Sequence, residues 1–331
     1  MRTEELVLQN NKLRVTLLSY GASIRGLEMP DQYGVMGPVH LVLDSAEQYR
    51  DPDRNPYLGA SVGRYANRIS NARFNLDGNE VALKANEGPN QLHGGERGFA
   101  RCMWQVRTHE HTPHGGSVTF ALSSPDGDQG FPGNLNVLSK YELDGDTLRI
   151  LYTATTDAPT VVNLTNHGYW NLDGMATVRA HCLRLNSTQF LPVGTDGLPV
   201  DSLQSVQGTP FDFRNRTLLE DALNARPAGF DHSYAVNGPL GQLRFAALVD
   251  STLSGRWMCV RTDQPAVQFY TGNGLGLPFH KFGALCLETQ MFPDTPNHPE
   301  LGSAVLRPGQ EYRSVTELRF GVGPHPLLGK E

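Results

Sequence analysis

Residues 135–154, LNVLSKYELDGDTLRILYTA, decide the fold class. Apolar side chains recur at every second position on both sides of a central Asp-Gly-Asp: Leu135, Val137, Tyr141 and Leu143, then Leu148, Ile150, Tyr152 and Ala154. Successive side chains of a strand point to opposite faces, so this period of two predicts two strands that each bury one face. Asp-Gly-Asp is a turn signal, and the stretch therefore predicts an antiparallel hairpin.

The same alternation returns at residues 118–122, 243–249 and 267–271. Helical patterns are few and short, at SAEQYR (residues 45–50) and TLLEDALNA (residues 217–225). Strands that are joined by turns, without long crossover helices, argue against a parallel sheet. We therefore expect an all-β protein, a large antiparallel β-sandwich with few short helices.

The composition agrees with many short strands, since the 331 residues include 35 glycines and 22 prolines. The sequence has no repeat of fixed period, no low-complexity tract and no linker rich in serine and glycine. We expect a single domain that spans residues 1–331.

The net charge and the cysteines limit which partners and which cellular compartment we expect. The formal net charge of −6 offers no basic surface to nucleic acid or anionic lipid. The first residues lack the apolar run of a signal peptide, and no run of 18 apolar residues occurs. Four widely separated cysteines predict reduced, mostly buried thiols. We expect a soluble cytoplasmic protein, monomer or homodimer, without nucleic-acid or membrane partners.

Three motifs invite a cofactor or metal interpretation but lack the required pattern. GNGLG (residues 272–276) does not have the G-x-G-x-x-G spacing of a dinucleotide site, and no amphipathic helix follows it. HEHTPH (residues 109–114) could hold zinc, but its proline and the two glycines after it favour an exposed hairpin tip. SPDGDQGFPG (residues 124–133) lacks the carboxylates of a calcium loop, which favours a tight loop. We expect no cofactor and no metal.

NLTNHGYWNL (residues 163–172) carries dense hydrogen-bonding chemistry in a stretch that otherwise has the pattern of a strand. One parity holds five residues, which a continuous strand would place on one face: Val161, Asn163, Thr165, His167 and Tyr169. That face would be a row of polar groups.

Other segments are also hard to explain by packing. Glu288 lies in the middle of the strand pattern of residues 284–290, and we prefer a cavity to an exposed edge, because buried carboxylates are rare unless they serve a function. His93 precedes two glycines, where the backbone can turn sharply and present an imidazole. Asn67 and Arg68 stand between apolar residues. Singly, a loop histidine or a surface ion pair would explain each of them.

Taken together, two histidines, a glutamate, Asp231, an Asn-Arg pair and aromatic residues form a coherent set. Planar amide, carboxylate and guanidinium groups span neighbouring hydroxyls, and aromatic faces cover the C–H side of a sugar. The set therefore indicates a neutral sugar as the ligand.

These residues lie in motifs that resemble those of the aldose 1-epimerases, also called galactose mutarotases, in the order of that family. The motifs cover essentially the whole chain: VGRYANRI (residues 62–69), NQLHGG (90–95), NLTNHGYWNL (163–172), GFDHSY (229–234), VQFYTGN (267–273) and LETQMFPDTPN (287–297). The resemblance implies a large antiparallel β-sandwich of the galactose mutarotase type, in agreement with the alternation.

The resemblance also implies roles for eight residues. His167 would be the general acid, Glu288 the general base, and His93 a second imidazole near the sugar's ring oxygen. Five residues would contact sugar hydroxyls: Asn67, Arg68, Tyr169, Asp231 and Gln268. The implied reaction interconverts the α and β anomers of free aldohexoses such as D-galactose and D-glucose, and proton transfer suffices for it.

The expected pKa values follow from the roles. Partial burial should raise the pKa of Glu288 toward neutrality, and His167 should titrate near the ordinary imidazole value of about 6.5. Each group would contribute a rate factor of about 10² to 10⁴.

Three alternatives remain open from the sequence. A glycosidase could use Glu288 with Asp231 as its carboxylate pair, but this leaves both histidines without clear roles. A sugar-binding sandwich without catalysis is the second alternative. An epimerase of hexose 6-phosphates is the third, and would need extra basic residues at the pocket, for which Arg97, Arg101 and Arg214 are candidates.

Overall fold

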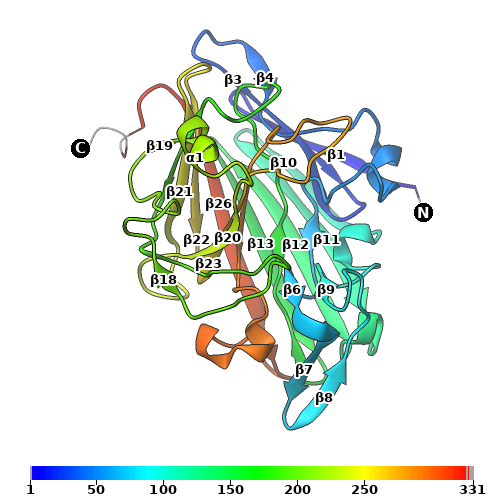
Figure 1. Ribbon diagram of the computed structural model, residues 1–331. Coiled ribbons are helices and arrows are strands. Elements are labelled where there is room, and N and C mark those ends of the chain that lie inside the picture. The colour runs from blue at the N-terminus through cyan, green and yellow to red at the C-terminus, as the bar shows by residue number, and fades with distance from the viewer. Residues whose placement is uncertain (1, 326, 328–331) are drawn as a thin grey trace.

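The computed structural model describes residues 2–325 and 327, and antiparallel β-sheets dominate it (Figure 1). The predicted hairpin is present: β12 (Leu135–Asp144) pairs with β13 (Thr147–Thr156), with Leu143 opposite Leu148. The apolar positions of both strands are buried, and the positions between them are more exposed. The expected antiparallel all-β architecture is confirmed. The other residues of the expected 1–331 domain lie outside this described part.

The hairpin belongs to a nine-stranded sheet, counted over the described residues. Its other strands are, in spatial order, β10 (Gln105–Thr112) and β11 (Gly115–Ser124) on one side, and β26 (Tyr312–Val322), β22 (Arg256–Thr262), β21 (Arg244–Ser251), β16 (His181–Leu185) and β19 (Thr217–Leu218) on the other. β26, near the C-terminus, pairs with both β13 and β22 and so joins the two halves of the sheet (Figure 1).

Two smaller sheets cover the inner face of the nine-stranded sheet. The first contains β1 (Glu5–Gln9), β2 (Arg14–Leu18), β3 (Ser23–Pro30) and β4 (Met36–Pro38). The second has the order β18 (Gln204–Ser205), β17 (Gln189–Phe190), β20 (Asp231–Ala235), β23 (Ala266–Tyr270) and β24 (Cys286–Gln290). Buried apolar side chains of all three sheets form one cluster, including Leu17, Phe120 and Phe269. The expected β-sandwich is therefore confirmed.

β23 and β24 have opposite chemistry on their two faces. Val267, Phe269 and Leu287 belong to the apolar core. Gln268 and Glu288, one position away, point to the other side and lie opposite each other in the ladder. The inner face of this sheet therefore closes the sandwich, and its other face is available for polar chemistry.

Short elements complete the fold. Short strands form two-stranded pairs, and two of these pairs, β5 with β15 and β14 with β25, join segments far apart in the sequence. These short strands are β5 (Ser61–Val62), β6 (Arg68–Ile69), β7 (Arg73–Leu76), β8 (Asn79–Ala82), β9 (Gln91–Leu92), β14 (Thr160–Val161), β15 (Thr165–Asn166) and β25 (Val305–Leu306). Six short 3₁₀ helices are η1 (Ala46–Arg50), η2 (Ser70–Ala72), η3 (Phe99–Arg101), η4 (Asp128–Gly130), η5 (Thr295–Asn297) and η6 (Pro299–Leu301), counted over residues 2–325 and 327.

The two predicted helical segments differ from the expectation in detail. Within residues 45–50, Ala46–Arg50 form the 3₁₀ helix η1 instead of an α-helix. Residues 217–225 begin as strand β19, whose backbone pairs with β16 at the edge of the large sheet, and only Leu219–Ala225 form the α-helix α1. Across the part of the chain that is described, no helix has the length and apolar character needed to span a bilayer.

The continuous strand expected over residues 161–169 is wrong. Two separate two-residue strands, β14 and β15, occupy this segment, because the backbone changes partner every few residues. Thr165 pairs with Val62, and Trp170 bridges both His40 and Leu285.

The asparagines of this segment act as cross-links between those partners. Asn163 donates to the carbonyl oxygen of Ala66 and accepts from the N–H of Met291. Asn166 donates to the carbonyl oxygen of Gly59. Hydrogen-bonding side chains therefore replace the strand ladder where it is broken.

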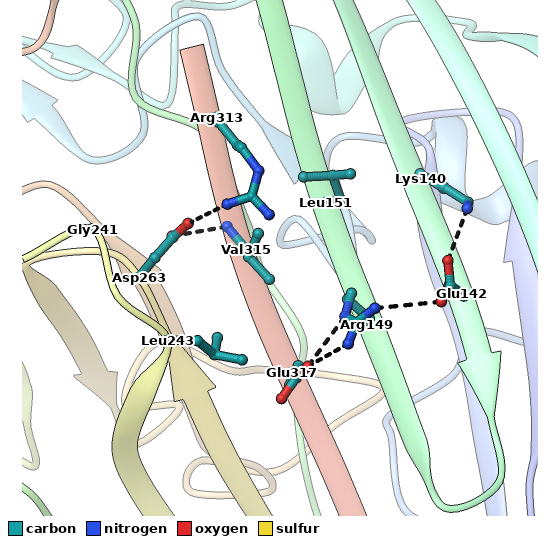
Figure 2. Close-up of a pocket in the computed structure, with 10 residues that line it drawn as sticks. All are labelled: Lys140, Glu142, Arg149, Leu151, Gly241, Leu243, Asp263, Arg313, Val315 and Glu317. Atoms are coloured by element: carbon teal, nitrogen blue, oxygen red, sulfur yellow. Dashed lines mark hydrogen bonds and ion pairs between the residues drawn. The ribbon is translucent and has the colours of Figure 1, made fainter.

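The outer face of the nine-stranded sheet is charged. Figure 2 shows a hollow on this face in which Arg149 contacts both Glu142 and Glu317, and Arg313 contacts Asp263. Each of these charges has an opposite partner. The arginines are about half exposed, whereas Glu317 and Asp263 are largely buried, so the network keeps these two carboxylates paired on a face that solvent reaches.

Buried histidines should make stability depend on pH. His40 is buried, its Nε2 accepts from the N–H of Tyr169, and burial lowers its pKa from 6.5 to about 4. As the pH falls below 6.5, the unfolded chain takes up a proton at this position and the folded chain does not, so the free energy of unfolding decreases until the pH reaches about 4.

Glutamine keeps a hydrogen-bond acceptor but does not titrate. We therefore predict that, between pH 6.5 and about 4, the free energy of unfolding of His40→Gln decreases by about 3 kcal/mol less than that of the wild type. Urea unfolding of both proteins at several pH values measures this difference in the free energy of unfolding. Replacement of the exposed His111 by glutamine is the control and should leave the slope unchanged. A wild-type slope in His40→Gln would contradict the assignment.

Candidate active site

A pocket lies on the polar face of the five-stranded sheet, and its lining contains all eight residues that the sequence analysis named. Strands contribute Arg68, Asp231, Gln268 and Glu288, and connecting segments contribute Asn67, His93, His167 and Tyr169. Pro56, Tyr57, Leu92 and Tyr270 complete the lining. The structure thus brings the predicted set together, and the individual roles stay predictions.

The ladder between β20, β23 and β24 positions the acidic and amide groups. Gln268 lies opposite Glu288, and Asp231 lies opposite Tyr270. Because directly opposite residues of an antiparallel pair share a face, all four side chains are on the pocket side. Glu288 is only 2% exposed, which agrees with a cavity and not with a sheet edge.

His167 is held by its backbone and by two aromatic rings. Its N–H donates to the carbonyl oxygen of Ala60, and its own carbonyl oxygen accepts from the N–H of Gly59, both at 2.9 Å. The imidazole lies between Tyr57, with ring centroids 5.9 Å apart, and Tyr169, at 4.9 Å, with an interplanar angle of 20° in both cases. This stack fixes the plane of the imidazole.

His167 and Glu288 form a close, buried pair. Nε2 of His167 lies 3.7 Å from Oε1 of Glu288. Burial lowers the pKa of His167 to about 4, so the expected value near 6.5 is wrong: the ring is desolvated on both faces. Burial, with a contribution from Asp231, raises the pKa of Glu288 well above its usual range, in the expected direction.

His93 and Asn67 hold each other in an unusual backbone conformation. Both residues have positive φ, 52° and 68°. The N–H of Asn67 donates to Nδ1 of His93, and the N–H of His93 donates to the carbonyl oxygen of Asn67. Since Nδ1 accepts, the ring proton is on Nε2, which makes His93 a hydrogen-bond donor. Burial lowers its pKa well below 6.5 and keeps it neutral.

A chain of hydrogen bonds orients Asp231. Ser233 donates to Oε1 of Gln268, and Nε2 of Gln268 donates to Oδ1 of Asp231 at 2.6 Å. Burial nevertheless raises the pKa of Asp231. The serine hydroxyl thereby decides which way the amide of Gln268 points.

The two arginines of VGRYANRI have different positions. Arg68 makes a bidentate pair with Glu87, with N–O distances of 2.7 and 2.8 Å, at the side of the pocket. Arg64 is buried away from the pocket and donates to Ser124 and to carbonyl oxygens of the 124–133 loop, including that of Gly133. The expected tight loop is therefore fastened by Arg64.

One group of side chains among the described residues has its potential metal-ligand atoms within 4.8 Å of one another: His167, Cys286 and Glu288. Sγ of Cys286 lies 3.6 Å from Nδ1 of His167, whereas Glu288 faces Nε2. The two groups approach different nitrogens of the ring, and their ligand atoms also lie within 4.8 Å of each other. Burial raises the pKa of the Cys286 thiol well above its ordinary value, so this thiol is protonated and is a weak ligand as it stands.

The motifs that the sequence analysis set aside lie elsewhere. His109 and His111 are exposed on β10, next to the turn that joins it to β11. Residues 272–276 follow β23 as a loop, without a helix. Neither segment contributes to the lining of this pocket.

Sequence reasoning missed Tyr57, Tyr270 and Cys286. Tyr270 shares its parity with Gln268 on β23, and that signal could have found it. Tyr57 lies in an irregular segment, and no periodicity points to it. Cys286 shares its parity with Glu288, but a cysteine in a strand is most simply explained as core.

An antiparallel sandwich with an imidazole and a carboxyl group facing one cavity is the arrangement of an acid–base enzyme. The family model of aldose 1-epimerase matches residues 4–319. The aldose 1-epimerase of Escherichia coli (strain K12) is 42% identical, over 95% of this chain and 94% of that protein. The galactose mutarotase of Bos taurus is 41% identical, over 96% and 94%. The chain belongs to the aldose 1-epimerase family, and it is an isomerase.

Solved structures agree. An aldose epimerase homologue from C. elegans has a TM-score of 0.91 at 29% identity, covering 98% of this chain and 100% of that chain. The galactose 1-epimerase of Lactobacillus acidophilus has a TM-score of 0.85 at 28% identity, with the same coverage. The galactose mutarotase-like fold expected from the sequence is confirmed.

We predict that Gly94→Ala distorts the pocket. Gly94 has a φ of +80°, and a Cβ there would lie 2.0 Å from the carbonyl oxygen of Gly63. Gly78 has a φ of +84° with open space around a Cβ, and is the matched control. Gly78→Ala should lower the free energy of unfolding by about 1 kcal/mol. Gly94→Ala should lower it by about 3 kcal/mol or more and should also reduce the activity. Urea unfolding measures both losses of stability, and equal losses in the two variants would contradict the steric argument.

Proposed function

We propose that the protein interconverts the α and β anomers of free aldohexoses such as D-galactose and D-glucose, with His167 as general acid and Glu288 as general base. The observation that carries this proposal is the buried pair of these two side chains, with 3.7 Å between Nε2 and Oε1, at one wall of a small polar pocket. The names of the relatives, aldose 1-epimerase and galactose mutarotase, support the substrate class.

The chemistry needs two proton transfers. The carboxylate of Glu288 removes the proton of the C1 hydroxyl while the imidazolium of His167 protonates the ring oxygen, and the C1–O5 bond breaks. The resulting aldehyde rotates about C1–C2, and the reverse transfers close the ring on the other face. His93 donates a hydrogen bond toward the ring oxygen, and Asn67, Arg68, Tyr169, Asp231 and Gln268 hold the hydroxyls.

One shared proton suffices for the pair throughout. A neutral imidazole with a protonated carboxyl group and an imidazolium with a carboxylate carry the same net charge of zero. Burial favours the first form, and attraction between the charges across 3.7 Å favours the second. Turnover only moves the proton between the two groups by way of the sugar.

The charges around the pocket support an unphosphorylated sugar. Arg68 is already paired with Glu87, and Asp231 and Glu288 are acidic. Arg101 lies over the ring of the lining residue Tyr57, with 4.9 Å from Cζ to the centroid. Arg214 pairs with Asp212, outside the lining. A phosphate group on the sugar would thus meet the carboxyl groups of Asp231 and Glu288 in the lining, with Arg101 as the cation beside it.

We predict that His167→Ala and Glu288→Gln each lower the rate of anomer equilibration by at least about 10²-fold, because each removes one transfer. Polarimetry or NMR of freshly dissolved α-D-galactose measures the rate. His109→Ala and Glu110→Gln, at exposed positions outside the pocket lining, are the matched controls. Undiminished rates in either pocket variant would remove its role. Binding without acceleration by the wild type would favour a sugar-binding module, and cleavage of a disaccharide would favour a glycosidase.

We further predict how kcat/KM changes with pH on the acidic side. The pair of His167 and Glu288 works while it holds one proton. Below pH about 4 the pair binds a second proton, and no base then remains. Hence kcat/KM for α-D-galactose should stay level as the pH falls through 6.5 and should decline near pH 4. Circular dichroism at each pH controls for unfolding. An inflection near 6.5 would mean that the imidazole is solvated.

We also infer a reducing compartment such as the cytoplasm. The four cysteines are free, and three of them are buried, which supports this placement.

A further inference from the structure

We propose that Tyr141, a buried residue of β12, is a positioning residue for the reaction: its hydroxyl holds the side chain of Asn166 and thereby fixes where the next residue, His167, lies. The proposal rests on the proposed role of His167. Tyr141 is 0% exposed and is outside the pocket lining. It belongs to the nine-stranded sheet, whereas the pocket lies on the five-stranded sheet.

Four hydroxyl groups meet inside the sandwich. Ser139 and Tyr141 belong to β12, Tyr152 to β13 and Ser61 to β5, and each of them is at most 3% exposed. Oγ of Ser61 lies 3.1 Å from the hydroxyl oxygen of Tyr141 and 2.9 Å from that of Tyr152. Burial of hydroxyl groups costs free energy unless they find partners, so packing alone would favour phenylalanine and alanine at these positions.

The hydroxyl of Tyr141 connects this cluster to the segment that carries His167. It donates to the carbonyl oxygen of Ala22 at 2.6 Å, and burial raises the pKa of Tyr141, so the group keeps the proton that it donates. Nδ2 of Asn166 donates one hydrogen to this hydroxyl at 3.1 Å and the other to the carbonyl oxygen of Gly59 at 2.6 Å. Both hydrogens of the amide are therefore used, which fixes its orientation.

Asn166 and Gly59 together hold His167 in place. The N–H of Gly59 donates to the carbonyl oxygen of His167, and the N–H of His167 donates to the carbonyl oxygen of Ala60. Because Asn166 directly precedes His167, a rotation of its backbone would move the imidazole. Nε2 of His167 has to stay 3.7 Å from Oε1 of Glu288, and an error of about 1 Å in such a geometry can lower a rate by about 10²-fold.

Removal of the Tyr141 hydroxyl would act on Asn166 and leave the other contacts of the cluster in place. The carbonyl oxygen of Ala22 would still accept from Oγ of Ser61, at 3.0 Å. The phenyl ring of phenylalanine would fill the same volume in the core. The amide of Asn166 would lose one of its two acceptors and could turn away from Gly59.

The first experiment compares Tyr141→Phe with Tyr234→Phe. Tyr141→Phe should lower kcat for α-D-galactose at least about 10-fold with little change in KM, because the sugar contacts stay and the acid is misplaced. Tyr234 is equally buried, and its hydroxyl has no hydrogen-bond partner in the part of the chain that the structure describes. Tyr234→Phe is therefore the matched control and should keep the kcat of the wild type. Circular dichroism confirms that both variants are folded.

A double-mutant cycle tests the route through Asn166. When the side chain of Asn166 is already removed by Asn166→Ala, Tyr141→Phe should cause little further loss of kcat, because both changes break the same link. A loss of kcat in the Asn166→Ala background as large as in the wild type would overturn the proposal. Unchanged kcat in Tyr141→Phe alone would overturn it as well.

Hydrogen exchange of the wild type gives a readout that needs no variant to fold. The side-chain N–H groups of Asn166 should exchange with solvent more slowly than those of the exposed Asn224, since both hydrogens have acceptors. Equal exchange rates would overturn the proposal. Failure of the proposed function is distinguishable: it would appear as full activity in His167→Ala, whereas wild-type kcat in Tyr141→Phe with an inactive His167→Ala would remove only the role of Tyr141.

Discussion

The alternation of side chains along β24 is the constraint on which the rest of the structure depends. Leu287 points into the core of the sandwich, and Glu288 points into the pocket. A slip of one residue would exchange them, burying the carboxyl group among apolar side chains and opening the pocket. Pairing with β23 prevents this slip, and the bridge between Leu285 and Trp170 ties the His167 segment to the same register. The contacts that close the sandwich therefore also set the distance between the acid and the base.

Burial then sets the electrostatics of the pocket. Desolvation moves the pKa of Glu288 upward and that of His167 downward, so both shifts disfavour charge. Neutral dipoles supply most of the surrounding order: a backbone N–H fixes the tautomer of His93, and an amide fixes Asp231. The pocket can thus rearrange protons without a large change in its net charge, which a low-dielectric site would oppose.

Much of the fold and of the site could be predicted, because each depended on a local pattern. The period of two in β12 and β13 is written in consecutive residues, and the motifs of the eight pocket residues are contiguous. The broken course of residues 163–172 could not be predicted, since its partners come from three distant segments. The pKa of His167 could not be predicted either, because it depends on rings contributed by Tyr57 and Tyr169 and on the depth of the pocket.

The partners of His167 also explain how so weakly basic an imidazole can serve as an acid. A carboxylate at Nδ1 would raise the pKa of the ring and retain its proton, as in hydrolytic triads. A thiol and two tyrosine faces leave the pKa at about 4, so the imidazolium is a stronger acid than in water and better matched to a feebly basic ring oxygen. The imidazolium of His167 is therefore rarely populated. Glu288 compensates for this because its carboxyl group, 3.7 Å away, can supply the proton. Acid strength and proton supply are thus divided between two side chains.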